Sequence, residues 1–357
     1  MPPSASDPER LLALGWGADL GAAFERYRDA GTAPARVTRV DRGRLHVMTA
    51  AGPTEARPAP GVGADSLDAA CTSDWVVLRR TADGGSFVHA VLPRRTLLTR
   101  AVAGGESQAQ PLAANADAVA LVEGLDPVPN LSRVERLLVL LWETGATPLV
   151  VLTKADLVPD PGAVAGQIAA VAAGVEVHVV SSATGDGYDA LAPYVGFGRT
   201  LALLGRSGAG KSSLTNRLTG AELETRSIRV DGRGRHTTVR RELVPVPGGG
   251  AVLDTPGVRS AGLWAADDGV ERVFGDVEEL TAACRFGDCG HDSEPGCAVQ
   301  DALADGRLEE RRWESYRKLQ REAAWIAART DARLRQERHR AWKQIHREMR
   351  RHPKARP

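Results

Sequence analysis

A glycine-rich loop that ends in lysine and serine is the strongest chemical signal in the sequence. It matches G-x-x-x-x-G-K-S, and with the serine that follows its members are Gly205, Arg206, Ser207, Gly208, Ala209, Gly210, Lys211, Ser212 and Ser213. Glycines allow backbone N–H groups to converge on phosphate oxygens at the start of a helix. We expect Lys211 to reach the β- and γ-phosphates of a nucleotide and the Ser212 hydroxyl to bind Mg²⁺. The strand-like run Thr200 to Leu204 before the loop and the helical run Ser213 to Leu218 after it give the motif its required context.

A second motif on the phosphate side is D-T-P-G, from Asp254 to Gly257, which follows the strand-like run Ala251 to Leu253. Asp254 is expected to make a second contact to Mg²⁺, directly or through water, and the backbone N–H of Gly257 to meet the γ-phosphate. Alone, this string could be any turn. Its position downstream of the glycine-rich loop is what favours the phosphate interpretation.

A loop suited to reading guanine lies upstream of the phosphate loop. Thr153-Lys154-Ala155-Asp156 follows the apolar run Leu149 to Leu152 and resembles the N-K-x-D motif of GTPases. Asp156 would accept hydrogen bonds from guanine N1–H and N2–H₂, whereas adenine presents a lone pair at N1 and would be repelled. The stem of Lys154 would pack over the purine ring. Thr153 stands where Asn is usual, and its single hydroxyl replaces an amide, which we expect to affect nucleotide affinity more than specificity.

A second base-side loop follows the next predicted strand, Val175 to Val180. It reads S-S-A-T-G and resembles the GTPase S-A-K loop, in which backbone N–H groups meet guanine O6. The residues concerned are Ser181, Ser182 and Ala183. A loop rich in Ser and Gly is weak evidence alone, but its place one strand after T-K-A-D strengthens the interpretation.

The order of these motifs is unusual, because the two base loops precede the phosphate loop. Ordinary GTPases begin with the phosphate loop. A circularly permuted order is physically possible where the old termini lie close enough to be joined. The permutation also carries switch II, near Asp254 to Gly257, directly into the C-terminal segment. We therefore hypothesise that nucleotide state is transmitted to that segment.

Three cysteines and a histidine crowd into one short C-terminal stretch, whereas Cys71 stands alone. The clustered residues are Cys284, Cys289, His291 and Cys297. A Cys₃His set completes a tetrahedral Zn²⁺ shell and leaves no open position for chemistry, so we expect one structural zinc ion. Metal stabilises small loops that lack a core of their own. The alternative is that these are unrelated reduced cysteines.

The remaining sequence predicts three kinds of structure. Short β-like runs punctuated by Gly, Pro and Asp predict a small N-terminal barrel, with Arg57 to Gly63 as a loop. The barrel runs are Ala35 to Val40, Arg44 to Thr49, Trp75 to Arg79 and Phe87 to Leu92. Further on, the buried-strand run Ala118 to Val122 and the helical run Leu131 to Trp142 begin an alternation typical of an α/β fold with a mainly parallel sheet. Beyond 307 a long, charged helix is predicted.

The composition is that of a folded protein, and the charge is unevenly distributed. Of 357 residues, 43% are hydrophobic and 25% charged, and the formal net charge is +1. From Arg307 onward, however, 17 Lys and Arg stand against 7 Asp and Glu, with tryptophans between them. Such a segment suits an RNA phosphate backbone, and the alternative is a solvated, ion-paired helix. No apolar run approaches the roughly 20 residues of a membrane span, and the first residues lack a signal-peptide layout. We expect a cytoplasmic protein, and nothing in the sequence demands more than a monomer.

The permuted motifs together resemble the ribosome small-subunit-dependent GTPase A family (RsgA/YjeQ). The segment Gly234 to Thr238 between the phosphate loop and D-T-P-G, the A-A-N-x-D segment within Leu112 to Asp117, and the run Asp254 to Arg259 carry the likeness, which covers most of the chain. The resemblance implies GTP hydrolysis to GDP and phosphate, stimulated by the 30S subunit during late assembly, with binding to 16S rRNA. It implies three domains: an N-terminal extension and OB-like β-barrel in 1–105, a circularly permuted α/β P-loop GTPase domain in 106–265, and a C-terminal α-helical zinc-binding domain with a basic helix in 266–357.

The resemblance also bears on catalysis. Thr238, by its position in the H-T-T run, is the expected switch I ligand of Mg²⁺, with Thr237 as the alternative. Val258 occupies the position after D-T-P-G where Ras-like enzymes carry a glutamine that orients water, and a valine cannot do so. The family resemblance offers His236 in its place, and the alternative is a solvated loop histidine.

Two other functions share parts of this pattern. A metabolite kinase could use the same phosphate loop, but it would need an acceptor pocket and a base, and it would have no need of T-K-A-D. A zinc-containing RNA-binding module could act through its tail alone and leave the phosphate loop idle. Hydrolysis rates measured with and without small ribosomal subunits distinguish the three.

Overall fold

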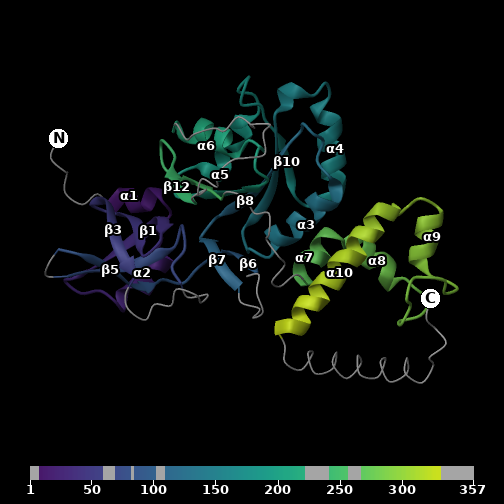
Figure 1. Cartoon of the computed structure of the whole chain (residues 1–357), viewed down its shortest axis with the longest axis horizontal. Coiled ribbons are helices and arrows are strands. Elements are labelled where there is room, and N and C mark those ends of the chain that lie inside the picture. Colours follow the sequence, from purple (N-terminus) through teal and green to yellow (C-terminus); the bar gives the residue numbers. More distant parts are fainter. Residues whose placement is uncertain are drawn as a thin grey trace.

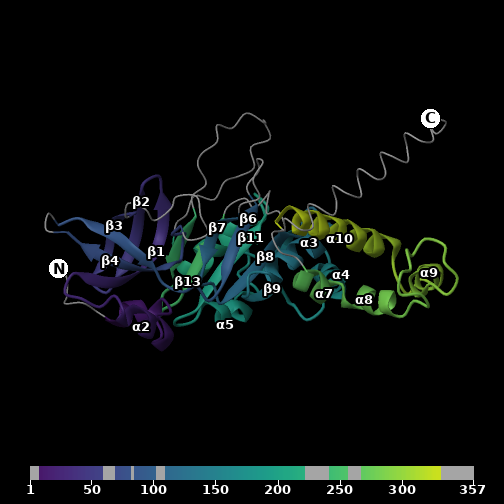
Figure 2. The same cartoon turned by 90° about the horizontal axis from the view of Figure 1, so that it is seen from below.

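Three parts follow one another along the chain and in space: a β-barrel, an α/β sheet and a group of helices (Figure 1). The computed structural model describes residues 8–58, 69–81, 84–101, 109–221, 241–255 and 267–330. Figure 2 shows the same row from below, with the barrel at one end and α9 (Ala298–Ala304) at the other. In the described residues no helix combines the length and the apolar character needed to cross a membrane.

The N-terminal barrel is closed, as the sequence predicts, with neighbouring strands in the order β1-β2-β3-β5-β4. Its strands are β1 (Thr32–Asp41), β2 (Arg44–Thr49), β3 (Gly52–Pro58), β4 (Trp75–Arg80) and β5 (Ser86–Val91). Alternate apolar side chains fill its interior, among them Val37, Val47, Val76 and Val88. The predicted loop Arg57 to Gly63 was wrong in its first two residues, because Arg57 and Pro58 belong to β3 and pair with β5 to close the barrel, and the rest of that run lies outside the described residues.

Strand β3 escaped prediction because it carries almost no apolar signal. Only Gly52 and Ala56 are buried along its seven residues. Two short helices, α1 (Pro8–Ala13) and α2 (Ala18–Glu25), were also not expected. They bury Leu11, Leu20 and Phe24 against the barrel end, where Trp16 meets the ring of Trp75 at 5.0 Å between centroids.

The central sheet has six strands in the order β10-β9-β8-β11-β13-β12, and all neighbours are parallel except the antiparallel edge pair β12–β13. This confirms the expected α/β fold. The strands are β8 (Ala118–Gly124), β9 (Thr147–Thr153), β10 (Glu176–Val179), β11 (Thr200–Gly205), β12 (Glu242–Pro245) and β13 (Ala251–Asp254). Strand β11 is buried along its whole length, as an inner strand covered by helices should be.

Helices and short turns connect these strands, and a two-stranded hairpin precedes them. The connecting elements are α3 (Leu131–Trp142), η1 (Ala155–Leu157), α4 (Pro161–Val171), η2 (Tyr188–Leu191), α5 (Ala192–Val195) and α6 (Lys211–Thr219), and the hairpin strands are β6 (Leu97–Ala101) and β7 (Ala109–Ala114). Helix α3 begins at an Asn130 cap whose side chain accepts from the backbone N–H of Arg133. Its buried face includes Val134, Leu138 and Leu141.

The C-terminal helices are α7 (Asp267–Val273), α8 (Gly275–Ala282), α9 and α10 (Glu310–Thr330). Of these, α7 and α10 pack onto α3, and α8 packs against α7 and α9. A fully buried carboxylate on α3, that of Glu135, accepts from Arg311 at 3.0 Å and from Arg312 at 2.9 Å, and Arg312 continues to Asp276 of α8. A buried carboxylate must keep such partners, since breaking a buried pair costs about 3–5 kcal/mol. The network therefore fixes α10 and α8 relative to α3.

Candidate nucleotide and metal sites

The carboxyl ends of four parallel strands bring the predicted nucleotide residues together. Strands β9, β10, β11 and β13 end at the same edge of the sheet, and each is followed by one of the predicted motifs. Parallel strands in adjacent positions place the loops after them side by side, whatever their order along the chain. Thr153, Ser181, Gly205 and Asp254 thus meet at one edge although a hundred residues separate the first from the last.

The phosphate loop has a backbone that only glycine can adopt. Gly205, Gly208 and Gly210 have φ angles of 156°, 82° and 87°, in the left-handed region. A Cβ added to Gly205 would lie 2.1 Å from the carbonyl oxygen of Val122 on the neighbouring strand. The loop is therefore fixed in an open curve that leads into helix α6, as a phosphate cradle requires.

Lys211 is held at the base of this loop. Its Nζ donates to the carbonyl oxygens of Gly205 at 2.9 Å and Arg206 at 2.8 Å. Burial lowers the pKa of Lys211, and the nearby carboxylates of Asp254 and Glu123 oppose that shift. A desolvated ammonium that donates to two carbonyl oxygens at the base of the loop is well placed to bind anionic phosphate.

Asp254 offers the donor set expected of a Mg²⁺ site. Burial raises the pKa of its carboxyl group, while Lys211 and a hydrogen bond with Ser212 act in the opposite direction. Its Oδ1 is buried and has no hydrogen-bond partner among the described residues. A buried, unpaired carboxylate oxygen beside a serine hydroxyl fits a hard cation that prefers oxygen ligands.

Thr153 braces the phosphate loop. Its hydroxyl, buried within the fold, lies 2.7 Å from the carbonyl oxygen of Ala209 and 3.4 Å from that of Glu123. An added Cβ on Gly210 would stand 3.0 Å from this hydroxyl oxygen, so the two loops are in close contact. The single hydroxyl that replaces the usual amide is therefore used to join loops, and none of its donor capacity remains for the base.

The carboxylate of Asp156, which the sequence predicts to read guanine, is held by the second base loop. Ser181 Oγ donates to Asp156 Oδ1 at 2.5 Å and accepts from the backbone N–H groups of Ala183 and Thr184, both at 3.2 Å. Lys154 adopts a left-handed backbone with φ of 61°, and its stem lies over Gly124. One serine hydroxyl thus fixes the carboxylate relative to the backbone N–H groups of its own loop.

Two residues that the sequence did not single out support the second base loop. Tyr188 forms a 2.7 Å hydrogen bond with the hydroxyl of Ser182, and the guanidinium of Arg217 lies over the tyrosine ring at 5.9 Å from its centroid. Arg217 belongs to α6, the helix that follows the phosphate loop. No local pattern could have identified this contact, because it joins elements that meet only in the fold. Four of the predicted residues, His236, Thr237, Thr238 and Gly257, lie outside the described residues.

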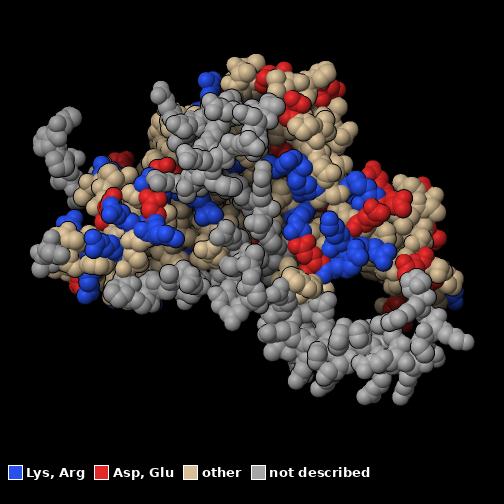
Figure 3. Space-filling view, viewed as in Figure 1, with Lys and Arg blue, Asp and Glu red and all other residues tan. Residues whose placement is uncertain are grey.

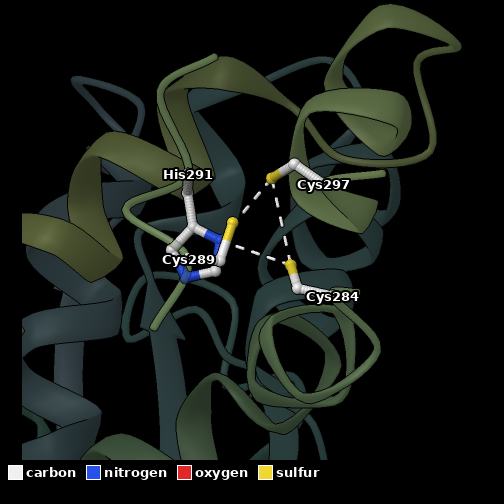
Figure 4. A group of neighbouring side chains, drawn as sticks. All are labelled: Cys284, Cys289, His291 and Cys297. Carbon is white, nitrogen blue, oxygen red and sulfur yellow. Dashed lines mark hydrogen bonds between the residues drawn. The ribbon is translucent and has the colours of Figure 1, made fainter. Parts of the chain in front are cut away.

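The C-terminal cysteines and histidine converge as the sequence predicts (Figure 4). Ligand atoms of Cys284, Cys289, His291 and Cys297 all lie within 4.8 Å of one another. The Sγ atoms of Cys284 and Cys297 are 3.9 Å apart, and His291 Nδ1 is 3.4 Å from the first and 3.6 Å from the second. Zn–S bonds of about 2.3 Å in a tetrahedron place sulfur atoms about 3.8 Å apart, so the cluster fits a zinc ion.

The metal cluster is tied to the long helix by aromatic contacts. The ring of His291 meets that of Trp313 edge to face at 5.5 Å between centroids, and Trp313 stacks on Tyr316 at 5.6 Å. Both aromatic residues belong to α10 and are buried. Four such ligands would complete a tetrahedral zinc shell with no open position, which would make the role of the metal structural.

Comparison with known proteins gives concordant similarities. A family model described as RsgA GTPase matches residues 91–264. A Streptomyces coelicolor protein named small ribosomal subunit biogenesis GTPase RsgA is 48% identical over 341 residues, which cover 94% of this chain and 92% of the relative. An Opitutus terrae protein of the same name is 41% identical over 94% of this chain and 96% of its own. Among solved structures, YjeQ from Thermotoga maritima is 25% identical with a TM-score of 0.58, covering 82% of this chain and 98% of that one.

If Asp156 reads guanine as the sequence predicts, replacing its carboxylate should change base selectivity. Asp156→Asn removes a charged acceptor for two guanine donors, and we expect GTP affinity to fall about 100-fold. Xanthosine triphosphate should gain affinity, because its C2 carbonyl can accept from the new amide. Competition against a fluorescent guanine nucleotide measures both changes. Asp160→Asn, at the exposed cap of α4, makes the same substitution nearby and should leave both affinities unchanged. Undiminished GTP binding by the Asp156 variant would exclude the assigned role.

Loss of one cluster residue should release the metal. We expect about one zinc ion per chain by elemental analysis, and almost none in Cys284→Ser, because three ligands bind this ion far more weakly than four. The variant should also unfold its C-terminal helices at a lower temperature. Cys71→Ala, which removes a thiol outside the cluster, should retain zinc. A zinc-free wild-type chain whose stability is unaffected by Cys284→Ser would contradict the metal assignment.

Proposed function

This chain belongs to the RsgA family of GTPases, and we propose from that premise that it hydrolyses GTP as a late assembly factor of the small ribosomal subunit. The observation that carries the proposal is the convergence of the base loops, the phosphate loop and Asp254 at one edge of the sheet. Relatives that are 48% and 41% identical over most of the chain are named small ribosomal subunit biogenesis GTPases.

The nucleotide would bind along this edge with its base and phosphates at opposite ends. Guanine would lie between the stem of Lys154 and the backbone of the loop at Ser181 to Ala183, with Asp156 selecting its N1–H and N2–H₂. The phosphates would occupy the loop from Gly205 to Ser213. Ser212 and Thr238 would hold Mg²⁺, with Asp254 as a further contact and Gly257 beside the γ-phosphate. GDP, which keeps the base and two phosphates, would remain bound after hydrolysis.

Hydrolysis would proceed by in-line attack of water on the γ-phosphorus. The new P–O bond forms as the bond to the β–γ bridging oxygen breaks, which leaves GDP and inorganic phosphate. Lys211 and the backbone N–H groups of the loop would stabilise the charge that develops on the transferred group. The Mg²⁺ ion that Ser212 and Thr238 would hold would supply positive charge to offset that of the phosphates. Because Val258 has no group that can orient water, we assign that task to His236 and expect slow turnover without a partner.

The partner surface would include the exposed side of α10, which lies beside α3 (Figure 1). Arg317, Lys318 and Arg321 are exposed there, and Trp325 follows on the same side with 47% exposure. Cations beside a tryptophan suit phosphates and an unpaired base of RNA. Acidic groups are also present on the helical part (Figure 3), and Asp292 lies 3.7 Å from Arg317. We propose that 16S rRNA is the RNA contacted.

Three further assignments complete the proposal. Boundaries near 105/106 and 265/266 would separate the barrel, GTPase and zinc domains, since the barrel closes before 105 and α7 begins at 267. A factor that acts on the small subunit would work in the cytoplasm. We propose that it acts as a monomer, because all assigned site residues lie on one chain.

The direct test compares GTP hydrolysis with and without purified small ribosomal subunits. Strong stimulation supports the proposal. Transfer of phosphate to a small molecule would support a kinase instead, and subunit binding that is indifferent to nucleotide would support a zinc-containing RNA-binding module.

The histidine assignment gives a second test. His236→Ala should leave GTP affinity unchanged and lower subunit-stimulated hydrolysis by about 100-fold, a typical loss for a group that positions or deprotonates a nucleophile. Equilibrium binding and single-turnover hydrolysis separate the two effects. Unchanged turnover would remove His236 from the mechanism.

The proposed RNA-facing side of α10 gives a third test. Lys318→Ala and Arg321→Ala should each weaken subunit binding and reduce the slope of log affinity against log salt by about 1, as expected for one lost phosphate contact. Titrations at several salt concentrations measure the slope. Arg307→Ala, an exposed arginine paired with Asp305 before α10, serves as the control. Equal slopes for all variants would favour the solvated, ion-paired helix.

A further inference from the structure

A buried arginine lies where the barrel meets the GTPase sheet. Arg36, on strand β1, is only 2% exposed, and its guanidinium lies over the ring of Trp75 at 5.0 Å from the centroid. Among the described residues no carboxylate lies within ion-pair distance of it. Its two Nη atoms donate instead to neutral oxygen acceptors, which offset part of its lost hydration, and the more distant carboxylates of Asp117 and Asp74 favour its charged form.

Those acceptors come from four different segments. Nη1 of Arg36 donates to the carbonyl oxygen of Leu14, which follows helix α1. Nη2 donates to Ser73 Oγ of the barrel at 2.6 Å, to the carbonyl oxygen of Asn115 at 2.8 Å, and to Thr200 Oγ1 at 3.1 Å. Thr200 is the first residue of β11, the strand that ends in the phosphate loop. One side chain therefore joins the N-terminal helix, the barrel, the linking segment and the sheet.

The A-A-N-x-D segment makes further hydrogen bonds between the barrel and the GTPase sheet. Asn115 has a left-handed backbone with φ of 55°, and its side chain accepts from the N–H of Arg95 at 3.0 Å and donates to the carbonyl of Ser73 at 3.2 Å. Asp117 accepts from the N–H of Thr200 at 2.8 Å through its carboxylate. The motif thus contacts the barrel through Asn115 and the start of β11 through Asp117. The start of β11 is the end of that strand opposite to the phosphate loop.

The N-terminal helix reinforces the same contact from another side. The carbonyl oxygen of Ala13, at the end of α1, accepts from the N–H groups of Gly198 at 3.1 Å and Gly250 at 2.6 Å, both in loops of the GTPase sheet. A Cβ on Gly250 would stand 2.3 Å from the carbonyl oxygen of Val195, so the close approach requires glycine there. These hydrogen bonds restrict the orientation of α1 relative to the GTPase sheet.

The energetics favour a single arrangement. Burial lowers the pKa of Arg36 to about 10, so the group remains protonated at neutral pH and keeps a full charge inside the protein. If the barrel turned relative to the sheet, that charge would lose acceptors on one side without gaining water. The cost of an unsatisfied buried charge exceeds that of a broken surface contact. The barrel is consequently held to one orientation.

We propose that Arg36, Asn115, Asp117 and Thr200, here termed the junction, act as positioning residues that hold the barrel in one orientation relative to the phosphate loop, and that subunit-stimulated hydrolysis depends on this orientation. The second clause rests on the proposed function. None of the four residues belongs to the predicted nucleotide motifs, so we expect intrinsic hydrolysis to be independent of them. A subunit that contacted both the barrel and the GTPase domain would need the two in a fixed relative orientation.

The test measures geometry and kinetics on the full-length chain. Fluorophores attached through azido side chains at the exposed positions Thr54, on β3, and Gln167, on α4, report the distance between barrel and sheet without touching native cysteines. Arg36→Met removes every donor at similar length, and Thr200→Val removes one acceptor while keeping the strand backbone. Arg28→Met, on an exposed arginine paired with Glu25, is the matched control.

We expect a single narrow distance distribution in the wild type and in Arg28→Met, and a broad one in Arg36→Met. Stimulated hydrolysis by Arg36→Met should fall about tenfold, a typical coupling between sites, with more subunit needed for half-maximal rate. Intrinsic hydrolysis should stay within about twofold of wild type. Thr200→Val should also broaden the distance distribution and lower stimulated hydrolysis, by smaller amounts. If Arg36→Met does not fold, Thr200→Val alone tests the positioning role.

A narrow distribution in both junction variants would overturn the positioning role, and so would wild-type stimulation in variants whose distribution is broad. If the wild-type chain itself showed no stimulation by small subunits, the proposed function would fail. The distance measurement would then still decide whether the junction fixes the barrel.

Discussion

Parallel pairing of β10, β9, β8, β11 and β13 is the constraint on which the rest of the molecule depends. It places the carboxyl ends of these strands at one edge, so the loops that follow them meet whatever their order along the chain. The order of the strands in the sheet, and not their order in the sequence, brings the motifs together. The hydroxyl of Thr153 in the base loop then donates to the carbonyl oxygen of Ala209 and joins that loop to the phosphate loop. Circular permutation is tolerated because it changes connections at the ends of the sheet and leaves the pairing intact.

The permutation changes which elements the nucleotide site can influence. Helix α3 begins near the base loop, where Arg133 holds the buried carboxylate of Glu123 at 2.9 Å, and its outer face holds α10 through Glu135. Because Thr153 also bonds to the carbonyl oxygens of Ala209 and Glu123, these contacts connect the phosphate loop to α10, whose Trp313 lies against His291. Residues 256–266, which lead to α7, lie outside the described residues, so direct transmission through switch II stays a hypothesis. The two routes end at the same helices, since α7 packs against α3.

The sequence predicted those parts whose signals are local. Buried runs such as Leu149 to Leu152 and Leu201 to Leu204 identify inner strands because they are apolar on both faces, and the metal ligands lie within one short segment. Strand β3 was missed because pairing, not burial, holds it in the barrel. The buried contacts of Arg36 could not be predicted either, because its hydrogen bond to Thr200 joins residues 164 positions apart. No local sequence pattern around Arg36 indicates a buried cation. The bracing role of Thr153 likewise appears only when the phosphate loop is folded beside it.

A crystal structure of the chain with Mg²⁺ and a non-hydrolysable GTP analogue would show where the nucleotide binds. We expect one nucleotide along the carboxyl edge of the sheet, with guanine on Asp156, phosphates in the loop from Gly205 to Ser213, and Mg²⁺ beside Ser212 and Asp254. A nucleotide bound elsewhere, or one whose base makes no contact with Asp156, would contradict this expectation.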